Sequence, residues 1–272
     1  MSQAKYALKL AYFGGEFFGS QIQPKVPTVA GALAQALRKG GFFTAPEEGK
    51  LLFASRTDRG VSALSNVAVY SGKKPILGKL NHLLPESVCV WGFAEVPEDF
   101  TPRHSERKTY LYFLPDSGED FSLLSRAVAQ FAAGERDFSA FSKKDSVEKN
   151  ARFALESAEV KRIPGFFLFS FTARNFLWNQ VRRMVGGAQE AAKGAINLSL
   201  LEALLLGKAG AGAVRGIPTA PAEGLVLYNI EYADLKFSEE KPVSLTERFR
   251  QPALAAAQTS KALSVLALKE PL

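Results

Sequence analysis

An aspartate between two arginines is the first group in this sequence that could do chemistry. Arg56, Thr57, Asp58, Arg59 and Gly60 form a polar stretch between two apolar runs. Asp with Gly is ordinary turn chemistry, so a solvated turn would account for these residue types. Two neighbouring guanidinium groups would also hold a carboxylate ionised and available as a nucleophile or base. The stretch alone therefore leaves two alternatives, a solvated turn and a catalytic site at Asp58.

The charge of the chain favours a polyanionic partner. Lys and Arg number 34 against 27 Asp and Glu, which gives a formal net charge of +7. Basic runs lie beside aromatic residues at 103–108, 142–144, 161–164 and 179–187. Phosphates bind such cations, and unpaired bases stack on aromatic rings. A basic but unspecialised surface would give the same net charge. The placement of the basic runs beside aromatic residues is therefore the feature that indicates a nucleic-acid partner.

Several other kinds of chemistry have no signature in the sequence. Cys89 is the single cysteine, in an apolar neighbourhood that predicts a core position, and no disulfide can form within the chain. With His82 and His104 it gives no zinc-ligand spacing. Neither the phosphate-binding loop nor the dinucleotide glycine pattern occurs. We therefore expect no metal and no nucleotide cofactor.

The sequence also predicts where the protein is found. The apolar runs fall far below the roughly 20 residues that cross a bilayer. The first residues alternate as a strand, unlike a signal peptide. We expect no membrane association and a cytoplasmic location.

The elements that must position the polar stretch form two halves, in which strands and helices follow one another in a similar order. In the first half, periodicity predicts strands at 4–12, 50–54, 66–70 and 88–96. Thr28 can cap a helix that stops at Gly40-Gly41, and a short helix is expected around 79–84.

The order restarts at about residue 107. A strand at 107–115 precedes a helix within 120–138 and a strand pair around Pro164. A long helix at 177–194 is expected to place Trp178 on its apolar side and Arg182 and Arg183 elsewhere. Asn197 can cap the next helix, and a strand within 223–237 closes this half.

These elements predict an α+β fold. We expect two pseudo-symmetric, mixed α/β sandwich halves with antiparallel-rich sheets and a cleft between them. The expected domains are 1–104, carrying Asp58, and 105–236, followed by a helical extension at 237–272.

Seven segments in register resemble one family, the tRNA pseudouridine synthases of the TruA type. The polar stretch is similar to that family's catalytic signature through Arg56, Thr57, Asp58, Gly60, Val61 and Ala63. The other six, in order, are 12–37, 80–85, 108–114, 136–143, 173–186 and 220–232. The form "RTDRGVSA" is more similar to archaeal and eukaryotic members than to bacterial ones.

The resemblance implies isomerisation of a uridine inside tRNA, at positions 38–40 of the anticodon stem-loop. The base would leave the sugar, rotate and rejoin through C5, which needs no cofactor. Asp58 is implied as the covalent participant. Whether it attacks the sugar carbon or helps to remove a sugar proton stays open.

The resemblance implies roles for further residues. Arg56 would hold Asp58 ionised and take part in opening the RNA. Tyr110 would stack on the flipped uracil and help to remove the C5 proton, although a half-buried strand tyrosine would look the same. Arg182 is a candidate partner for Asp58 or for phosphate, whereas Arg183 is expected to be solvated. The expected substrate-binding residues are Thr57, Arg59, Gln21, Gln23, Lys108, Asn179 and Arg174.

Two other functions compete with this one. A catalytically silent tRNA-binding or RNA-folding protein could use the same scaffold, but an isolated carboxylate repels phosphate. A hydrolase with an aspartate nucleophile is disfavoured because most glycosidases need a pair of carboxylates, and the signature supplies one. The resemblance also implies a homodimer.

Overall fold

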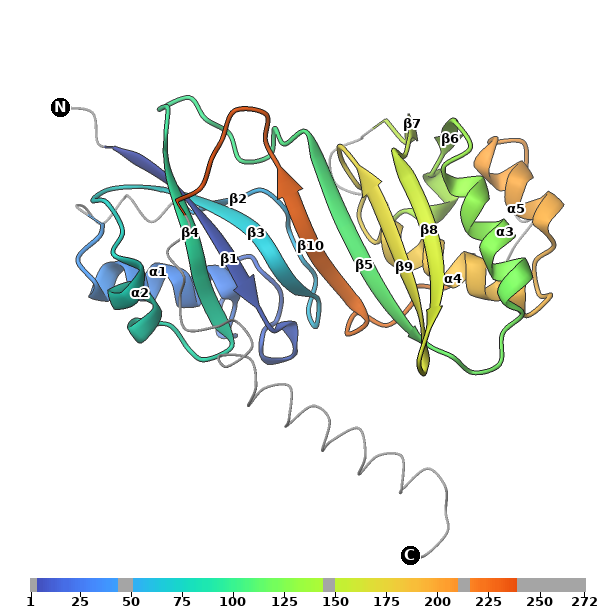
Figure 1. Ribbon diagram of the computed structural model, residues 1–272, viewed down its shortest axis with the longest axis horizontal. Helices are drawn as coiled ribbons and strands as arrows, with labels where there is room; N and C mark the ends of the chain where they lie inside the picture. The colour runs from blue at the N-terminus through green and yellow to red at the C-terminus, as the bar shows by residue number, and fades with distance from the viewer. Residues whose placement is uncertain (1–3, 44–50, 144–149, 210–215, 239–272) are drawn as a thin grey trace, which may run out of the picture. The chain divides into compact units, whose positions relative to one another are not determined.

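The computed structural model describes residues 4–43, 51–143, 150–209 and 216–238 (Figure 1). The chain forms two compact units. Unit 1 comprises Met1–Arg103 with Asp234–Leu272, and unit 2 comprises His104–Ala233. The helical extension predicted at 237–272 lies outside the described residues apart from Phe237 and Ser238, and the predicted domain boundaries and cleft stay predictions.

Unit 1 is an antiparallel sheet with two α-helices. Its elements are β1 (Lys5–Tyr12), the 3-10 turn η1 (Gly14–Glu16), α1 (Val29–Lys39), β2 (Leu52–Phe53), β3 (Ser62–Ser71), α2 (Leu77–Leu83) and β4 (Val88–Val96). Strand β1 pairs with both β3 and β4, and β2 pairs with β3. The strand order is therefore β4-β1-β3-β2, which is the order of the ferredoxin-like βαββαβ motif.

Unit 2 repeats this topology with additions. Its elements are β5 (Arg107–Pro115), α3 (Phe121–Phe131), β6 (Glu135–Asp137), η3 (Ser139–Phe141), β7 (Arg152–Ala154), β8 (Ser157–Ile163), β9 (Phe166–Ala173), α4 (Gln180–Ala192), α5 (Leu198–Leu205) and β10 (Leu225–Glu231). Strand β5 pairs with β10 and β9, and β8 pairs with β9, all antiparallel. The order β10-β5-β9-β8 matches β4-β1-β3-β2 strand for strand. The predicted α+β class with two similar halves is confirmed.

Local capping fixes where three helices begin. The side chains of Thr28, Asp120 and Asn197 each accept a hydrogen bond from the backbone N–H three residues on. The caps predicted at Thr28 and Asn197 are confirmed. The helix after Asp120 ends at Phe131 rather than continuing toward 138, because β6 follows it and pairs with β7.

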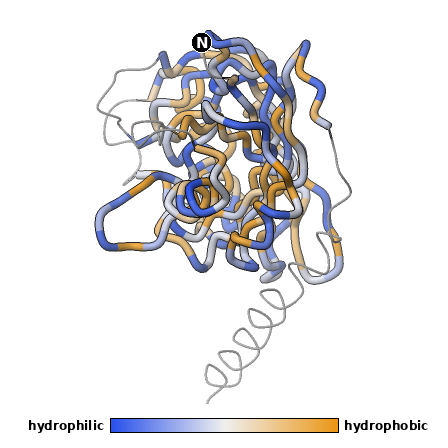
Figure 2. Tube along the Cα trace, turned by 90° about the vertical axis from the view of Figure 1, so that its left-hand side faces the viewer, coloured by the Kyte–Doolittle hydropathy of each residue, from blue (hydrophilic) through white to orange (hydrophobic). Residues whose placement is uncertain are grey.

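The core of unit 2 lies on one side of its sheet. Burial alternates along β9, where Phe167, Phe169 and Phe171 are fully buried. Phe138 and Phe141 are also fully buried, and the core position predicted for Cys89 in unit 1 is confirmed. Figure 2 maps the hydropathy of each residue onto the Cα trace, along which hydrophobic and hydrophilic positions are interspersed.

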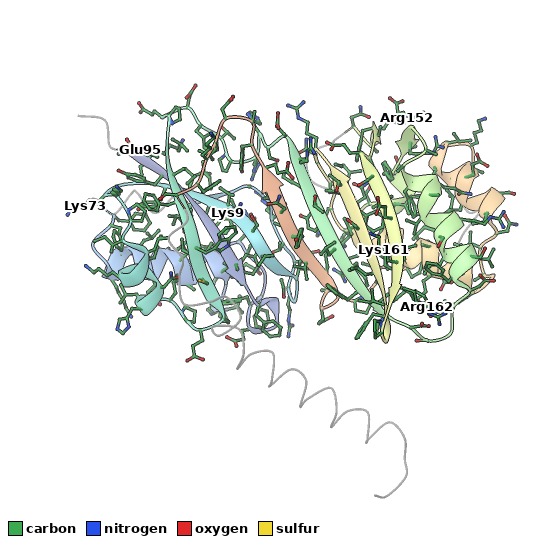
Figure 3. All side chains as sticks on the ribbon, in the orientation of Figure 1. Lys9, Lys73, Glu95, Arg152, Lys161 and Arg162 are labelled. Atoms are coloured by element: carbon green, nitrogen blue, oxygen red, sulfur yellow. The ribbon has the colours of Figure 1, made fainter. Side chains whose placement is uncertain are left out.

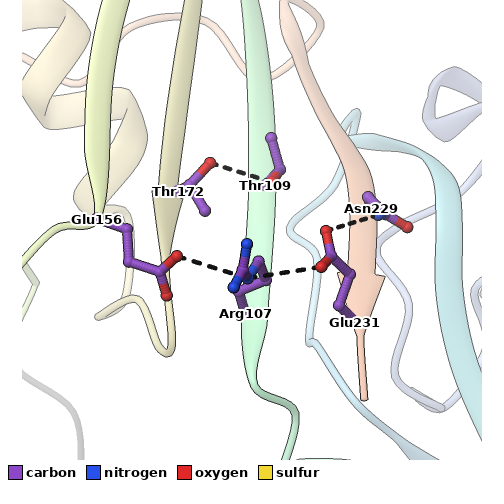
Figure 4. Close-up of polar contacts among 6 residues, drawn as sticks. All are labelled: Arg107, Thr109, Glu156, Thr172, Asn229 and Glu231. Atoms are coloured by element: carbon purple, nitrogen blue, oxygen red, sulfur yellow. Dashed lines mark hydrogen bonds and ion pairs between the residues drawn. The ribbon is translucent and has the colours of Figure 1, made fainter. Parts of the chain in front are cut away.

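The opposite side of this sheet carries a polar cluster at one end (Figure 4). Nε of Arg107 lies 3.5 Å from a carboxylate oxygen of Glu156 and 3.5 Å from one of Glu231. The hydroxyls of Thr109 and Thr172 are 3.1 Å apart on the neighbouring strands. Because the three charged side chains are nearly half exposed, their pairing contributes little stability. The two sides of the sheet thus differ in burial, and the helices cover the buried one.

Helix α4 begins later than the sequence predicts. Asn179 adopts a left-handed conformation with φ of 62°, and the helix begins at Gln180. Trp178 therefore precedes the helix and is 41% exposed, so its predicted place on the apolar side of the helix is wrong.

No helix in the described part of the chain is long and apolar enough to cross a membrane.

The segment after α5 packs closely on α4. A Cβ added at Gly186 would lie 2.2 Å from the carbonyl oxygen of Pro218. We expect Gly186→Ala to destabilise the protein by about 1–3 kcal/mol through overpacking, although alanine is the better helix former. Urea unfolding measures the difference.

Gly78→Ala is the matched control for this substitution. Gly78 lies in α2, and a Cβ there would meet nothing within 4 Å. Gly78→Ala should leave stability unchanged or raise it slightly. Equal unfolding midpoints for Gly186→Ala and the unaltered protein would contradict the close packing of α4.

Candidate active site

The loop that carries Asp58 connects β2 to β3 in unit 1. Within it Arg56 and Arg59 are exposed, Asp58 is partly exposed, and Thr57 is only 7% exposed. The middle of the stretch is therefore anchored in the protein. A freely solvated turn, the first alternative for this sequence, does not describe it.

A buried hydrogen-bond network provides the anchor. The Thr57 N–H donates to Oγ of Ser20 at 2.8 Å, and the Ser20 N–H donates to the carbonyl of Thr57 at 3.0 Å. The hydroxyls of Tyr12 and Thr57 are 2.8 Å apart, and Nδ2 of Asn66 donates to the Tyr12 hydroxyl at 3.0 Å. All four residues are buried. In a low-dielectric interior such a network holds its members in one geometry, because an unmade bond leaves a buried polar group unsatisfied.

Asn66 also fixes the start of the loop. Its Nδ2 donates to the carbonyl of Ser55 at 2.9 Å, and the Ser55 N–H donates to its Oδ1 at 3.3 Å. One side chain on β3 therefore binds the backbone before Asp58 and the tyrosine hydroxyl that contacts Thr57. The position of Asp58 is set from both directions.

Glycines let the loop after β1 approach the Asp58 loop. A Cβ at Gly14 would lie 2.3 Å from the carbonyl oxygen of Val61. Gly19 has φ of 102°, and a Cβ there would lie 2.9 Å from the carbonyl oxygen of Thr57. Only glycine combines that backbone conformation with so close an approach. The glycine-rich run near the N-terminus thus supports the Asp58 loop.

Arg59 joins the exposed part of the same arrangement. Its guanidinium lies 4.2 Å from the ring centroid of Phe18, which is 38% exposed. Gln21 and Gln23 are exposed in the loop that carries Phe18, and Nε2 of Gln23 donates to the carbonyl of Phe18 at 2.6 Å. The structure thus brings Arg59 to the loop of the two glutamines.

In unit 2, Arg182 of α4 is held by the backbone. Its Nε donates to the carbonyl of Ala220 at 2.7 Å, and its Nη1 donates to Oδ1 of Asn179 at 3.4 Å. The Ala220 N–H donates in return to the carbonyl of Arg182 at 3.1 Å. Asn179 therefore orients this guanidinium, a role that the sequence did not indicate.

Tyr110 and Lys108 lie on the buried side of β5. Tyr110 is 6% exposed, and its ring meets that of Phe176 edge-on with centroids 5.1 Å apart. Lys108 is 5% exposed, which departs from the surface position that substrate binding would imply, because alternation along β5 turns it inward with Tyr110. Arg174, just after β9, is exposed as expected.

Arg183 departs from its expected solvated position. It is only partly exposed, and its Nη1 donates to the carbonyl of Ser142 at 2.9 Å. Because this bond ties the segment before residue 144 to α4, Arg183 has a structural role.

Tyr112 is a residue of this region that the sequence analysis missed. Burial raises its pKa to about 12, although the positive charge of Arg182 acts in the opposite direction. Its hydroxyl donates to the carbonyl of Pro221 at 2.9 Å. Tyr112 therefore stays neutral at pH 7 and holds the segment that binds Arg182. Its place two residues after Tyr110 on one strand was the available signal.

Comparison with known proteins identifies the family of this chain. A family model described as tRNA pseudouridine synthase matches residues 127–233. The chain is 40% identical to tRNA pseudouridine synthase A of Thermococcus kodakarensis over 90% of this chain and 91% of that protein. It is 36% identical to proteins of the same name from Archaeoglobus fulgidus, over 86% and 85%, and Methanosarcina mazei, over 85% of each chain.

The chain belongs to the tRNA pseudouridine synthase A family. The family assignment made from the seven sequence segments is confirmed. The roles of individual residues, including the pairing of Arg56 with Asp58, stay predictions.

The buried network can be tested by removing the hydroxyl of Thr57 while keeping the shape of its side chain. Thr57→Val removes the hydroxyl that meets Tyr12 while keeping the β-branched form. We expect a loss of about 1–3 kcal/mol in the free energy of unfolding. We also expect kcat on tRNA to fall by about 10- to 100-fold, because Asp58 is displaced.

Thr57→Ser is the matched control because it keeps the hydroxyl. It should unfold within about 1 kcal/mol of the unaltered protein and retain most of its turnover. Urea unfolding and initial rates measure both effects. If valine and serine behaved alike, the hydroxyl network would have no part in placing Asp58.

Proposed function

We propose that this chain isomerises uridine to pseudouridine in tRNA and that Asp58 is the carboxylate that acts on the target nucleotide. The anchoring of its loop is the observation that carries the proposal. Thr57 and Gly60 are buried, Asp58 between them is partly exposed, and Arg56 and Arg59 are exposed. A fixed carboxylate flanked by exposed cations suits a substrate whose phosphates must bind nearby.

The reaction conserves all atoms of the nucleotide. The bond between C1′ and N1 breaks, a bond between C1′ and C5 forms, C5 loses a proton and N1 gains one. Asp58 would either attack the sugar carbon or help to remove a sugar proton, and both roles need the ionised carboxylate. Arg56 would favour that form and take part in opening the RNA, since a stacked base must leave its stack first.

Unit 2 would supply the other participants. Tyr110 would stack on the uracil and help to remove the C5 proton. Arg182, whose guanidinium is oriented by Ala220 and Asn179, would bind Asp58 or a phosphate. A preoriented guanidinium suits either role because little motion is needed during reaction. Thr57, Arg59, Gln21, Gln23, Lys108, Asn179 and Arg174 stay proposed RNA contacts, of which Thr57 and Lys108 are the buried ones.

Three finer points belong to the proposal. The target would be the anticodon stem-loop, at positions 38–40, which position-resolved mapping of pseudouridine in tRNA tests. The enzyme would act as a homodimer, which sedimentation measures. It would work in the cytoplasm, which cell fractionation shows.

Asp58→Asn tests the central residue. We expect pseudouridine formation to fall by roughly 10³-fold or more, because the amide neither attacks nor takes a proton. The Kd for tRNA should stay within about tenfold, because phosphate contacts supply most of the affinity. Asp99→Asn is the control, since Asp99 is an exposed carboxylate in the same unit. Retained turnover in Asp58→Asn would refute this role, and a silent RNA-binding protein would form no product even unaltered.

Tyr110→Phe tests the second residue. The ring and its edge contact with Phe176 remain, whereas the hydroxyl is lost. We expect turnover to be lost with the free energy of unfolding nearly unchanged. Rate assays measure the turnover of this variant, and urea unfolding measures its stability. A normal rate would show that Tyr110 is a structural residue only.

A further inference from the structure

An exposed tryptophan lies at the start of α4. Trp178 is 41% exposed, although its large apolar ring would favour burial. The residues on either side of Trp178 fix its position. The left-handed Asn179 follows it, and the Leu177 N–H before it donates to Oε1 of Gln180, a residue only 1% exposed. The backbone on both sides of Trp178 is therefore fixed.

A lysine accompanies the exposed ring. Nζ of Lys143 lies 4.3 Å from the ring centroid of Trp178, which is cation–π distance. The Lys143 N–H also donates to the carbonyl of Trp178 at 2.9 Å. Nη1 of Arg183 donates to the carbonyl of the adjacent Ser142 at 2.9 Å. Two segments distant in sequence are thus joined so that a cation and an indole face solvent together.

This pair differs from the other tryptophan of the chain. Trp91 is less exposed, and its Nε1 donates to the carbonyl of Leu64 at 2.9 Å. Lys9 lies 4.5 Å from its ring centroid, on a strand that pairs with that of Trp91 (Figure 3). Trp91 is therefore part of a sheet surface, whereas Trp178 lies in the connection between β9 and α4, which also carries the exposed Arg174.

We propose that Trp178 and Lys143 form a stacking platform for an unpaired nucleobase of tRNA. The ring would stack on the base, and Lys143 would bind a phosphate next to it. An aromatic face with a neighbouring cation is the chemistry by which proteins hold single-stranded bases. The inference rests on the proposed function, because it extends the tRNA contacts of that enzyme beyond the reacting uridine.

Tryptophan fluorescence tests stacking directly. The chain has two tryptophans, so the full-length Trp91→Phe protein reports on Trp178 alone. Circular dichroism and filter binding first confirm that this variant is folded and binds tRNA as tightly as the unaltered protein. A transcribed tRNA should then quench the fluorescence, with saturation at the Kd measured by filter binding. A blunt RNA duplex, which has no unpaired bases, should quench much less at equal occupancy.

Variants in the otherwise unaltered protein give the affinity. Trp178→Ala should weaken tRNA binding by about tenfold, and Trp178→Phe by less than about threefold because a stacking face remains. Lys143→Gln should weaken binding and lower the slope of log Kd against log salt by about one. Tyr228→Ala and Lys73→Gln should change neither, since Tyr228 is a 45% exposed aromatic residue of β10 and Lys73 is an exposed lysine of unit 1 (Figure 3), and both lie outside the proposed platform.

The outcomes separate this proposal from the proposed function. Equal quenching by tRNA and duplex, or an unchanged Kd in Trp178→Ala, would overturn the platform even if pseudouridine forms normally. Quenching by tRNA with a weakened Kd in Trp178→Ala would support it even if no pseudouridine forms, in which case the proposed function alone fails.

Discussion

The hydroxyl contact between Tyr12 and Thr57, buried among Ser20 and Asn66, is the interaction on which the Asp58 loop depends. It joins residues that are 45 positions apart in the chain and holds a backbone that β pairing alone would leave unconstrained. Each of these four side chains is hydrogen-bonded, so no buried polar group is left unsatisfied when the loop is held in place. The network thereby fixes the backbone that carries the Asp58 carboxylate. Arg56 and Arg59 beside it stay exposed, where a substrate can contact them.

The two units show how one topology is specialised. In unit 1 the connection between the second and third sheet strands is the long Asp58 loop, whereas in unit 2 the corresponding β8–β9 connection is the short turn at Pro164 and Gly165. The residues that we propose to act in unit 2 lie on β5 and at the start of α4. There the backbone of Ala220 orients Arg182, and Tyr112 holds the segment at Pro221. The proposed chemistry thus lies on a loop, a strand and a helix start, while the repeated sheets supply rigidity.

Local signals in the sequence predicted much of this fold, because capping and alternation act over a few residues. Thr28 and Asn197 are caps, and the predicted strands at 88–96 and 107–115 have those bounds. The errors arose where distant contacts decide. Trp178 faces solvent because Asn179 turns left-handed before the helix, and Lys108 is buried because the helices cover its side of β5. The anchoring of Thr57 depends on two partners distant in sequence, Tyr12 and Ser20, so no local pattern could reveal it.

The most direct test of the account is the time course of pseudouridine formation in a single tRNA transcript incubated with the purified protein and a chelator, without added nucleotide. The account predicts that pseudouridine accumulates over many turnovers at discrete uridines and that no base is released, because the isomerisation conserves every atom of the nucleotide. Free uracil in the reaction, or tRNA that binds and remains unmodified, would contradict it.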